Sequence, residues 1–315
     1  WDDDEVVEVD DLDDVADLGD LGDDEEIDPR TLAALGFDLE DLDVFDDEDE
    51  LLPVVAIVGR PNVGKSTLVN ALVGYKVSIV APKPQTTRHR ILGVHTVAGG
   101  QLVFVDTPGL HEPTGRAINR YLNRTARGAL GDANVIALVV EAARWTAEDD
   151  AALSACAATG LPMVLVLNKV DRVKDRTGLL PRLAELARRH PFAALVPVSA
   201  LKRDGLERLE RTLLELLPEG EAAFEADAVT DRSERFMGAE LIREQVVRQL
   251  HDELPFSTTV AIDSWKVERG LLRIMATIWV ERAGQKGIVV GAGGAQIKAI
   301  GTKARLALAK QAGRR

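Results

Sequence analysis

Cysteine is almost absent from this chain, and long hydrophobic runs are absent altogether. Cys156 is the only cysteine among 315 residues, so no disulfide can close within the chain. The longest apolar runs fall well short of the roughly 18 residues that a membrane-spanning helix needs. The first residues are acidic and lack the apolar segment of a signal peptide. These features exclude a disulfide-bonded scaffold and predict neither a signal peptide nor a transmembrane segment.

Basic charge is scarce at one end of the chain and acidic charge is scarce at the other. Residues 1–50 hold 25 acidic residues and one basic residue, Arg30, although the whole chain has a net charge of only -14. Residues 51–315 therefore carry +10, and the part from Arg282 onward has eight basic residues and no acidic one. A basic end favours a polyanionic partner such as RNA, although a solvated charged face has the same composition.

Residues 1–50 form a low-complexity acidic segment with too few Val and Leu residues to offset the entropy of ordering. We predict a disordered extension, interrupted by one short helix at 31–35 with Asp28 as its cap. The extension either keeps the chain soluble or folds back over the basic remainder and competes with RNA at low salt.

Five short apolar runs separated by helical stretches follow the acidic segment. They predict buried strands at 53–58, 101–106, 134–140, 162–168 and 194–199, with helices at 67–73, 147–158 and 179–190 between them. This alternation predicts an α/β fold with a doubly wound parallel sheet. The pattern changes after Pro218 to a helix at 233–253 and two alternating strands, 257–265 and 271–281, joined near Gly270. The second part is therefore predicted to be a separate α+β domain.

A phosphate-binding loop follows the first strand. GRPNVGKS at 59–66 fits the pattern G-x-x-x-x-G-K-[ST] and opens a helix, which is the context that this motif requires. Backbone amides of the loop would surround the phosphates, the Lys65 ammonium would approach the β and γ phosphates, and Ser66 would ligate Mg²⁺. We expect nucleotide contacts from Gly59, Arg60, Pro61, Asn62, Val63, Gly64, Lys65, Ser66 and Thr67.

Three later strand ends carry the other contacts of one guanine nucleotide. Asp106, in the sequence DTPG, would hold Mg²⁺ through water, and the Gly109 amide would lie near the γ-phosphate. Asp171, in NKVD, would accept hydrogen bonds from guanine N1–H and its amine, and the Ala200 amide would donate to guanine O6. The full predicted set is Asp106, Thr107, Pro108, Gly109, Leu110, Asn168, Lys169, Val170, Asp171, Ser199, Ala200 and Leu201.

These motifs, with QTTRHR at 85–90, RAINRYLN at 116–123 and RWT at 144–146, resemble the Era-like branch of the translation-factor-related GTPases. The resemblance covers residues 54–311 and leaves out the acidic segment. It implies an Era-type G domain at 51–218, a linker at 219–230 and a type II KH domain at 231–315. It also implies GTP hydrolysis, a GTP/GDP switch, and Thr86 or Thr87 as the switch residue that reaches Mg²⁺ and the γ-phosphate. The residues alone do not decide between the two threonines.

Leu110 stands where many small GTPases have a glutamine that orients the attacking water. Intrinsic hydrolysis is therefore expected to be slow. The resemblance also implies a role for K⁺, because relatives with this substitution use a P-loop asparagine to hold K⁺. Asn62 occupies that position. Asn62 either holds K⁺ beside the phosphates or only braces the loop.

The basic end of the chain contains the G-x-x-G pattern of KH domains, from Gly291 to Gly294. This turn would join two helices, admit an RNA backbone close to the loop, and place single-stranded bases in an adjacent apolar groove. The predicted RNA contacts are Lys286, Gly291, Ala292, Gly293, Gly294 and Lys298. Two features depart from the family: the loop centre lacks a basic residue, and the sequence stops at Arg315, where relatives continue with a strand and a helix. We therefore expect an incomplete KH sheet with an unpaired edge.

Other residue types give weaker signals. The five histidines show no metal-ligand spacing, and each is expected to be structural, with His111 as the one remaining catalytic candidate. Trp145 and Trp279 either stack on bases or, as isolated tryptophans usually do, serve packing.

The resemblance implies a cytoplasmic GTPase that acts on the 3′ region of 16S ribosomal RNA during assembly of the 30S subunit, with a possible peripheral contact to the inner membrane. An alternative from another class is an RNA-binding assembly factor whose nucleotide is a structural ligand with negligible turnover. A fragment of a GTPase with two G domains is disfavoured, because the chain has one P-loop and KH features in its C-terminal half.

Overall fold

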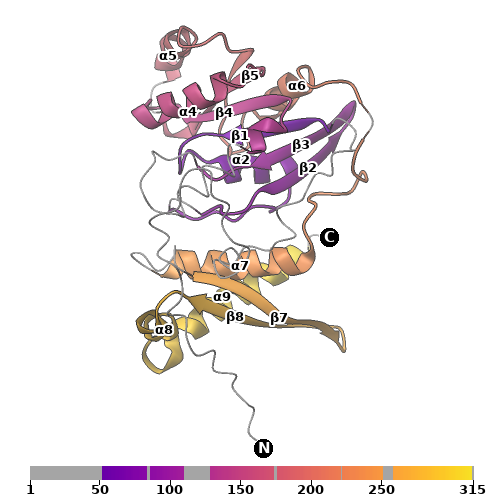
Figure 1. Ribbon diagram of the computed structural model, residues 1–315, viewed down its shortest axis with the longest axis vertical. Helices are drawn as coiled ribbons and strands as arrows, with labels where there is room; N and C mark the ends of the chain where they lie inside the picture. The colour runs from indigo at the N-terminus through magenta and orange to yellow at the C-terminus, as the bar shows by residue number, and fades with distance from the viewer. Residues whose placement is uncertain are drawn as a thin grey trace, which may run out of the picture.

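The computed structural model consists of two units stacked along its long axis (Figure 1). It describes residues 52–83, 86–109, 128–173, 176–220, 222–250 and 258–313. The acidic segment 1–50 with its predicted short helix, and the residues Leu110 and His111, lie outside these ranges. No helix in the described ranges is long and apolar enough to cross a lipid bilayer.

The upper unit is built on a six-stranded sheet with the strand order β2-β3-β1-β4-β5-β6. All five predicted strands are confirmed within a residue or two at their ends. The strands are β1 (Val54–Val58), β2 (Ile91–Val97), β3 (Gly100–Asp106), β4 (Val135–Glu141), β5 (Met163–Asn168) and β6 (Ala194–Pro197). Because β1 lies between β3 and β4, the strand order reverses beside β1, and a ligand site is expected at its carboxyl end.

One strand, β2, was not predicted, and it makes the sheet mixed rather than wholly parallel. It pairs antiparallel with β3, from Ile91 opposite Asp106 to Val97 opposite Gly100. Gly93 and His95 interrupt its apolar run, so the segment lacks the continuous hydrophobicity of the buried strands. It is an edge strand, and it begins at Ile91, opposite Asp106 at the end of β3. Residues 86–90, which come directly before it, therefore lie beside the predicted nucleotide site.

Helices cover both faces of the sheet, as a doubly wound fold requires. Alternate residues of β1 point to opposite sides: Val55 and Ile57 pack in one core, and Val54 and Ala56 in the other. The first core also contains residues of α2 (Lys65–Val73) and α6 (Leu206–Leu214), and the second contains residues of α4 (Ala147–Ala157) and α5 (Leu179–Leu186). Helix α6 lies directly before Pro218, which was predicted to end a helix, and α5 ends before its predicted end at His190.

The lower unit has the predicted α+β composition. It consists of α7 (Glu234–Gln249), β7 (Thr258–Glu268), β8 (Leu271–Val280), α8 (Ala283–Val290) and α9 (Ala295–Ala312). Strands β7 and β8 form an antiparallel hairpin, and its turn residues Arg269 and Gly270 both have positive φ, 51° and 77°. Two positive φ angles match the right-handed twist of a hairpin, which confirms the predicted turn.

Helix α7 is the part of the lower unit that lies next to the upper unit (Figure 1). Its apolar residues Val246 and Leu250 pack with Val289 and Ile300 of α8 and α9. Its charged residues Glu240, Arg243 and Glu244 are nevertheless buried, with exposed fractions of 4%, 2% and 1%. A helix buried on its polar side as well as its apolar side must have a partner there, and that partner is the upper unit.

The second sheet has two strands among the described residues, β7 and β8. The hairpin leaves large apolar side chains open to solvent, including Leu271 and Met275, which are 74% and 59% exposed. These side chains form an exposed apolar face on the described hairpin.

Candidate functional site

The loop at 59–64 connects β1 to α2 at the point where the strand order reverses, as predicted. Gly64 has a φ of 100°, and a Cβ atom there would lie 2.5 Å from Asn168 Nδ2. The close approach of the 168–171 segment to the loop therefore requires glycine at this position. Helix α2 begins at Lys65, so its free amides and positive dipole end face the loop. This is a ready-made site for an anion.

Lys65 is directed into the loop that it follows. Its Nζ atom donates to the carbonyl oxygens of Gly59 at 2.9 Å and Arg60 at 3.2 Å, and the residue is 7% exposed. Burial lowers the pKa of Lys65 to about 8, although the nearby Asp106 carboxylate opposes this effect. Phosphate oxygens would supply the negative charge that a buried ammonium needs, so the lysine is poised to pair with them.

Three oxygen-bearing side chains converge beside the loop, and they are the ones predicted to hold Mg²⁺. Ser66 Oγ lies 2.9 Å from Thr87 Oγ1, and Thr87 Oγ1 lies 3.5 Å from Asp106 Oδ2. Asp106 is fully buried, and its Oδ1 atom has no hydrogen-bond partner among the described residues. Burial raises the pKa of Asp106, against the lowering effects of Ser66 and Lys65. An all-oxygen set with a buried, unpaired carboxylate oxygen fits Mg²⁺.

The structure separates the two threonines that the sequence left equivalent. Thr87 joins Ser66 and Asp106, whereas the Thr86 hydroxyl donates to the Lys83 carbonyl at 2.8 Å. The geometry therefore favours Thr87 as the metal-side residue. Thr86 instead contacts the lower unit, because its carbonyl accepts a hydrogen bond from Arg243 Nη2 at 2.7 Å.

The DTPG segment leaves the carboxyl end of β3 beside the loop. Thr107 Oγ1 donates to the Ile57 carbonyl at 2.8 Å, which ties the segment to β1. Pro108 and Gly109 are buried at the end of the described range. The nucleotide contact expected of Leu110 and the catalytic candidacy of His111 lie outside that range.

The predicted base-binding residues lie together at the ends of β5 and β6. Asp171 is exposed, and its Oδ1 accepts a hydrogen bond from Ser199 Oγ at 2.6 Å, which fixes the carboxylate while leaving it accessible. Asn168 Oδ1 accepts from the Ala200 amide at 3.0 Å, and Asn168 Nδ2 donates to the Val63 carbonyl at 2.9 Å. The Ala200 amide thus holds residues 168–171, which we call the base loop, and its role toward guanine O6 stays a prediction. Leu201 is 70% exposed at the rim.

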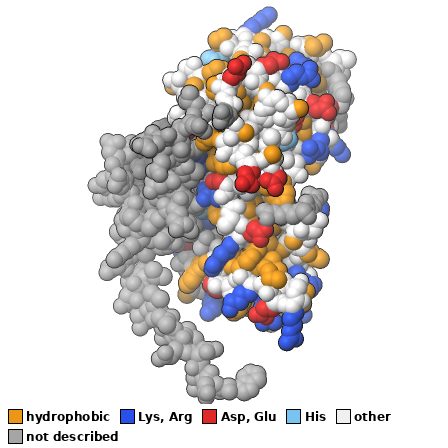
Figure 2. Space-filling model, turned by 90° about the vertical axis from the view of Figure 1, so that its right-hand side faces the viewer, with side chains coloured by type: hydrophobic (Ala, Val, Ile, Leu, Met, Phe, Trp, Pro, Cys, Tyr) orange, Lys and Arg blue, Asp and Glu red, His pale blue; other side chains and the backbone are white. Residues whose placement is uncertain are grey.

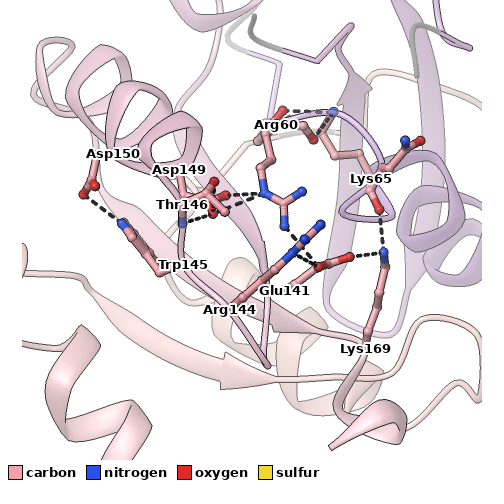
Figure 3. A network of polar contacts seen from close by, with 11 residues as sticks. Arg60, Lys65, Glu141, Arg144, Trp145, Thr146, Asp149, Asp150 and Lys169 are labelled. Atoms are coloured by element: carbon pink, nitrogen blue, oxygen red, sulfur yellow. Dashed lines mark hydrogen bonds and ion pairs between the residues drawn. The ribbon is translucent and has the colours of Figure 1, made fainter. Parts of the chain in front are cut away.

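A charge network beside the loop was not predicted (Figure 3). Glu141, at the end of β4, forms ion pairs with Arg60, Arg144 and Lys169. Asp149, in the first turn of α4, forms a second ion pair with Arg60 at 3.2 Å. The signal available in the sequence was a carboxylate at the end of a buried strand, which is also where Asp106 and Asp171 lie.

A second cluster missed from the sequence joins residues 76–90 to α7. Arg243 forms hydrogen bonds of 2.6 and 2.7 Å with Glu240 and also reaches the Thr86 carbonyl. Glu244 pairs with Lys76 and accepts from the Val80 amide at 3.2 Å. His89 is buried in the same interface, where burial lowers its pKa to about 4. Neutral and enclosed, His89 has the structural role expected of it.

The G-x-x-G turn joins α8 to α9, as predicted. Gly291 has a φ of 74°, and a Cβ atom there would lie 2.6 Å from Gln296 Cβ, so the tight turn requires glycine. Ala292 and Gly293 are exposed at the tip, and Lys286 and Lys298 are exposed on the two helices. The positive charge near the turn therefore comes from its flanks and not from its centre.

A groove of about 940 Å³ lies between β8 and the helices α8 and α9. Its apolar lining includes Ile278, Val289 and Ile297, and its basic side chains include Lys286 and Arg305. Figure 2 shows hydrophobic side chains flanked by Lys and Arg on the lower part of the molecule. Trp279, one of two candidate stacking residues, is 58% exposed, while Trp145 donates to Asp150 Oδ1 at 2.8 Å.

Two family models match the chain in the two units. The model described as a 50S ribosome-binding GTPase matches residues 54–169, and the model described as a KH domain matches residues 253–315.

Curated relatives and solved structures agree with these models. The chain is 58% identical over 252 residues to GTPase Era of Xanthomonas axonopodis pv. citri, which covers 80% of this chain and 84% of the relative. It is 57% identical over 251 residues to GTPase Era of Xylella fastidiosa, with the same coverage. A crystal structure of Era with MgGDPNP and nucleotides 1506–1542 of 16S ribosomal RNA is similar, with a TM-score of 0.78 and 38% identity over 81% of this chain and 87% of that one. Aquifex aeolicus Era bound to GDP and AlF4⁻ has a TM-score of 0.78 at 37% identity, over 82% of this chain and 89% of that one.

Proposed function

This chain belongs to the Era family of GTPases, and from that premise we propose that it is a GTP-driven switch that presents its KH unit to ribosomal RNA. The main support is the hydrogen bond from Arg243 of α7 to the carbonyl of Thr86, the residue before the predicted metal-side Thr87. A segment that senses the nucleotide is thereby joined directly to the first helix of the RNA-binding unit.

We assign the domains at the boundaries that the sequence indicates. Residues 51–218 form the G domain, 219–230 the linker and 231–315 the KH unit. The buried charged side of α7 supports this division, because a helix of the second unit supplies the contacts to the first. The predicted cytoplasmic location is consistent with the predicted RNA partner, and a peripheral membrane contact stays a prediction.

The chemistry assigned to the G domain follows from the placement of its side chains. Hydrolysis joins a water oxygen to the γ-phosphorus and breaks the bond from that phosphorus to the β–γ bridging oxygen, which releases GDP and phosphate. Lys65 and the amides at the start of α2 stabilise negative charge on the phosphates, and Asp171 selects guanine. Ser66, Thr87 and Asp106 would hold Mg²⁺, which when bound supplies positive charge to the β and γ phosphate oxygens.

The RNA partner is proposed from the KH geometry and from the relative. The related Era structure contains nucleotides 1506–1542 of 16S ribosomal RNA. In this chain, the exposed turn at 291–294 lies beside an apolar groove with basic residues, which suits a phosphate backbone and its unstacked bases. We propose that it binds the same 3′ region of the small-subunit RNA during assembly of the 30S subunit.

Switch coupling rests on the buried interface between the units. If the segment at 76–90 moves when the γ-phosphate is lost, the hydrogen bonds of Arg243 and Glu244 to that segment must break or move with it. Arg243 would keep its pair with Glu240, and Glu244 its pair with Arg248, but each buried hydrogen bond to the segment that is lost without a replacement costs roughly 1–3 kcal/mol. The position of α7, and with it that of the KH unit, is therefore expected to follow the nucleotide state.

Asn62 is proposed as a K⁺ ligand beside the phosphates. It is exposed at the outer turn of the loop with a φ of 62°, and its backbone is fixed because its carbonyl accepts from Lys169 Nζ. This contact holds the backbone from which the Asn62 side chain extends. A monovalent cation there would stabilise the charge that develops on the leaving phosphate oxygens.

We expect phosphate release to be about tenfold faster in K⁺ than in Na⁺ at equal ionic strength, since added charge stabilisation is worth at least that much. Multiple-turnover release with saturating GTP and Mg²⁺ measures this. Asn62→Ala is expected to remove the difference between the two salts while leaving GDP affinity within about threefold. Equal rates in the two salts would contradict the K⁺ proposal, and a single turnover followed by no further release would support a structural role for the nucleotide.

A further inference from the structure

Glu141 is the centre of a charge network that joins the phosphate loop to the base loop (Figure 3). Its Oε2 atom accepts from Arg60 Nη2 at 3.1 Å and from Arg144 Nε at 2.8 Å, and its Oε1 accepts from Lys169 Nζ. Arg60 belongs to the phosphate loop and Lys169 to the base loop. One carboxylate at the end of β4 therefore contacts both halves of the predicted nucleotide site.

The Arg60 side of this network is rigid. Arg60 is 4% exposed, and its Nε atom donates to Asp149 Oδ2 at 3.2 Å. Asp149 is itself fixed, because it accepts from the Thr146 amide and hydroxyl, both at 2.9 Å, in the capping box of α4. The Arg60 backbone carbonyl is one of the two that accept from Lys65 Nζ. Holding the Arg60 side chain thus also fixes a backbone oxygen that positions the phosphate-binding lysine.

The Lys169 side ties the two loops together. Lys169 has a φ of 64°, an uncommon conformation for a residue with a side chain, and its Nζ atom donates to the Asn62 carbonyl as well as to Glu141. Its neighbour Asn168 donates to the Val63 carbonyl. Two adjacent residues of the base loop therefore donate hydrogen bonds to two adjacent carbonyls of the phosphate loop. Glu141 orients one of these two side chains, that of Lys169.

The contacts of Glu141 favour its charged form. Partial burial raises the pKa of Glu141, but hydrogen bonds and ion pairs with Lys169, Arg144 and Arg60 outweigh it and lower that pKa to about 2. The carboxylate is thus ionised at any pH at which the protein is used. Its two partners in the loops compensate for that charge.

We propose that Glu141 is a positioning residue that sets guanine nucleotide affinity by holding the phosphate loop and the base loop at a fixed separation. A nucleotide spans both loops, so its base and its phosphates bind together only if the loops are correctly spaced. The proposal rests on the GTPase assignment and adds to it a residue outside the predicted nucleotide contacts.

Electrostatics alone predict the opposite result, which makes the sign of the effect diagnostic. Nucleotides are anions, so removing a carboxylate from the neighbourhood of the phosphate loop would by itself strengthen binding. Removing a positioning residue weakens binding, because Lys169 and Arg60 lose their common anchor. Glu141→Gln keeps the size of the side chain and removes its charge, and it therefore separates the two effects.

For Glu141→Gln we expect the Kd values of GDP and of a non-hydrolysable GTP analogue to rise together by about tenfold, with kcat at saturating GTP changed by less than about threefold. Kd is measured by fluorescence titration with a labelled nucleotide, and kcat by phosphate release. In a Lys169→Met background the same substitution is expected to change Kd by less than about twofold, because the link is already broken. Glu185→Gln is the matched control, since Glu185 pairs with Arg182 on α5 and lies 53% exposed.

A Kd for Glu141→Gln that equals or falls below that of the unaltered protein would overturn the proposal, as would a tenfold rise that persists in the Lys169→Met background. Thermal unfolding shows whether the variant folds. If it does not, Glu141→Asp keeps the charge but shortens the reach, and an unchanged Kd for that variant would also overturn the proposal. Failure of the unaltered protein to bind GDP would instead contradict the GTPase assignment itself.

Discussion

Replacing Lys65 by methionine is expected to slow GTP hydrolysis by at least about a hundredfold, which is the usual loss when one preorganised donor to the reacting group is removed. Lys65 is buried in the phosphate loop and donates to two of its carbonyls, so its ammonium is already aimed where phosphates would bind. Methionine fills similar space without the charge. Single-turnover phosphate release measures the effect, with Arg208→Met on the exposed face of α6 as the control.

The same substitution separates catalysis from stability. Burial lowers the pKa of Lys65 to about 8, which means that burial disfavours its charged form. For a lysine with a folded pKa below the unfolded value, folding is penalised at low pH, and the penalty disappears as the pH rises through that range. Lys65→Met is therefore expected to leave the Tm of the nucleotide-free protein unchanged or raised at pH 7. Hydrolysis within about threefold of the unaltered protein would contradict the role assigned to Lys65.

Replacing Asp171 by asparagine is expected to weaken GTP binding by about a hundredfold or more, as sites built around a substrate hydrogen bond do when the pairing is lost. The Asp171 carboxylate offers two acceptors to guanine N1–H and its amine, whereas an amide would place a donor against one of these donors. Xanthine has a carbonyl in place of the amine, so the same substitution is expected to favour xanthosine triphosphate.

The surroundings of Asp171 allow this substitution without disturbing the fold. Asp171 is exposed, and its contact with Ser199 Oγ can be kept by the amide oxygen, so the fold is expected to tolerate the change. Competition of GTP and xanthosine triphosphate for a labelled nucleotide measures the preference, with Asp227→Asn in the linker as the control. If Asp171→Asn still prefers GTP by the original factor, the carboxylate is not the guanine-selecting group.

The sequence was sufficient to predict which residues the fold brings together at the candidate nucleotide site, because its signals are local. A P-loop needs only a buried strand, a glycine-rich turn and a helix start, all within 20 residues of Val54. Asp106 and Asn168 each follow an apolar run, and parallel strands bring their carboxyl ends to one edge of the sheet. Thr86 and Thr87 were indistinguishable because they are adjacent in sequence, and only the packing of Thr86 toward α7 separates them.

The contacts that the sequence did not reveal join residues far apart in the chain. Glu141 and Arg60 are 81 residues apart, and Arg243 and Thr86 are 157 apart. The helical spacing of the apolar residues in α7 predicted one apolar face. The burial of its Glu240 and Arg243 is explained only by the G domain that covers them. Strand β2 was missed because glycine and histidine lower its hydrophobicity, while its pairing with β3 is what holds it in the sheet.

We propose that the nucleotide state controls RNA binding through α7. The most direct test is the affinity of a fluorescent single-stranded RNA, taken from the 3′ end of 16S ribosomal RNA, for the protein saturated with GDP and then with a non-hydrolysable GTP analogue. Arg243→Gln, measured in parallel, is expected to bring the two affinities together, because it removes the contact with the Thr86 carbonyl.

For the unaltered protein, we expect RNA binding to be about tenfold tighter with the GTP analogue, which lies within the usual range of coupling between two sites. Equal RNA affinity in the two nucleotide states, in a protein that binds both nucleotides, would contradict it.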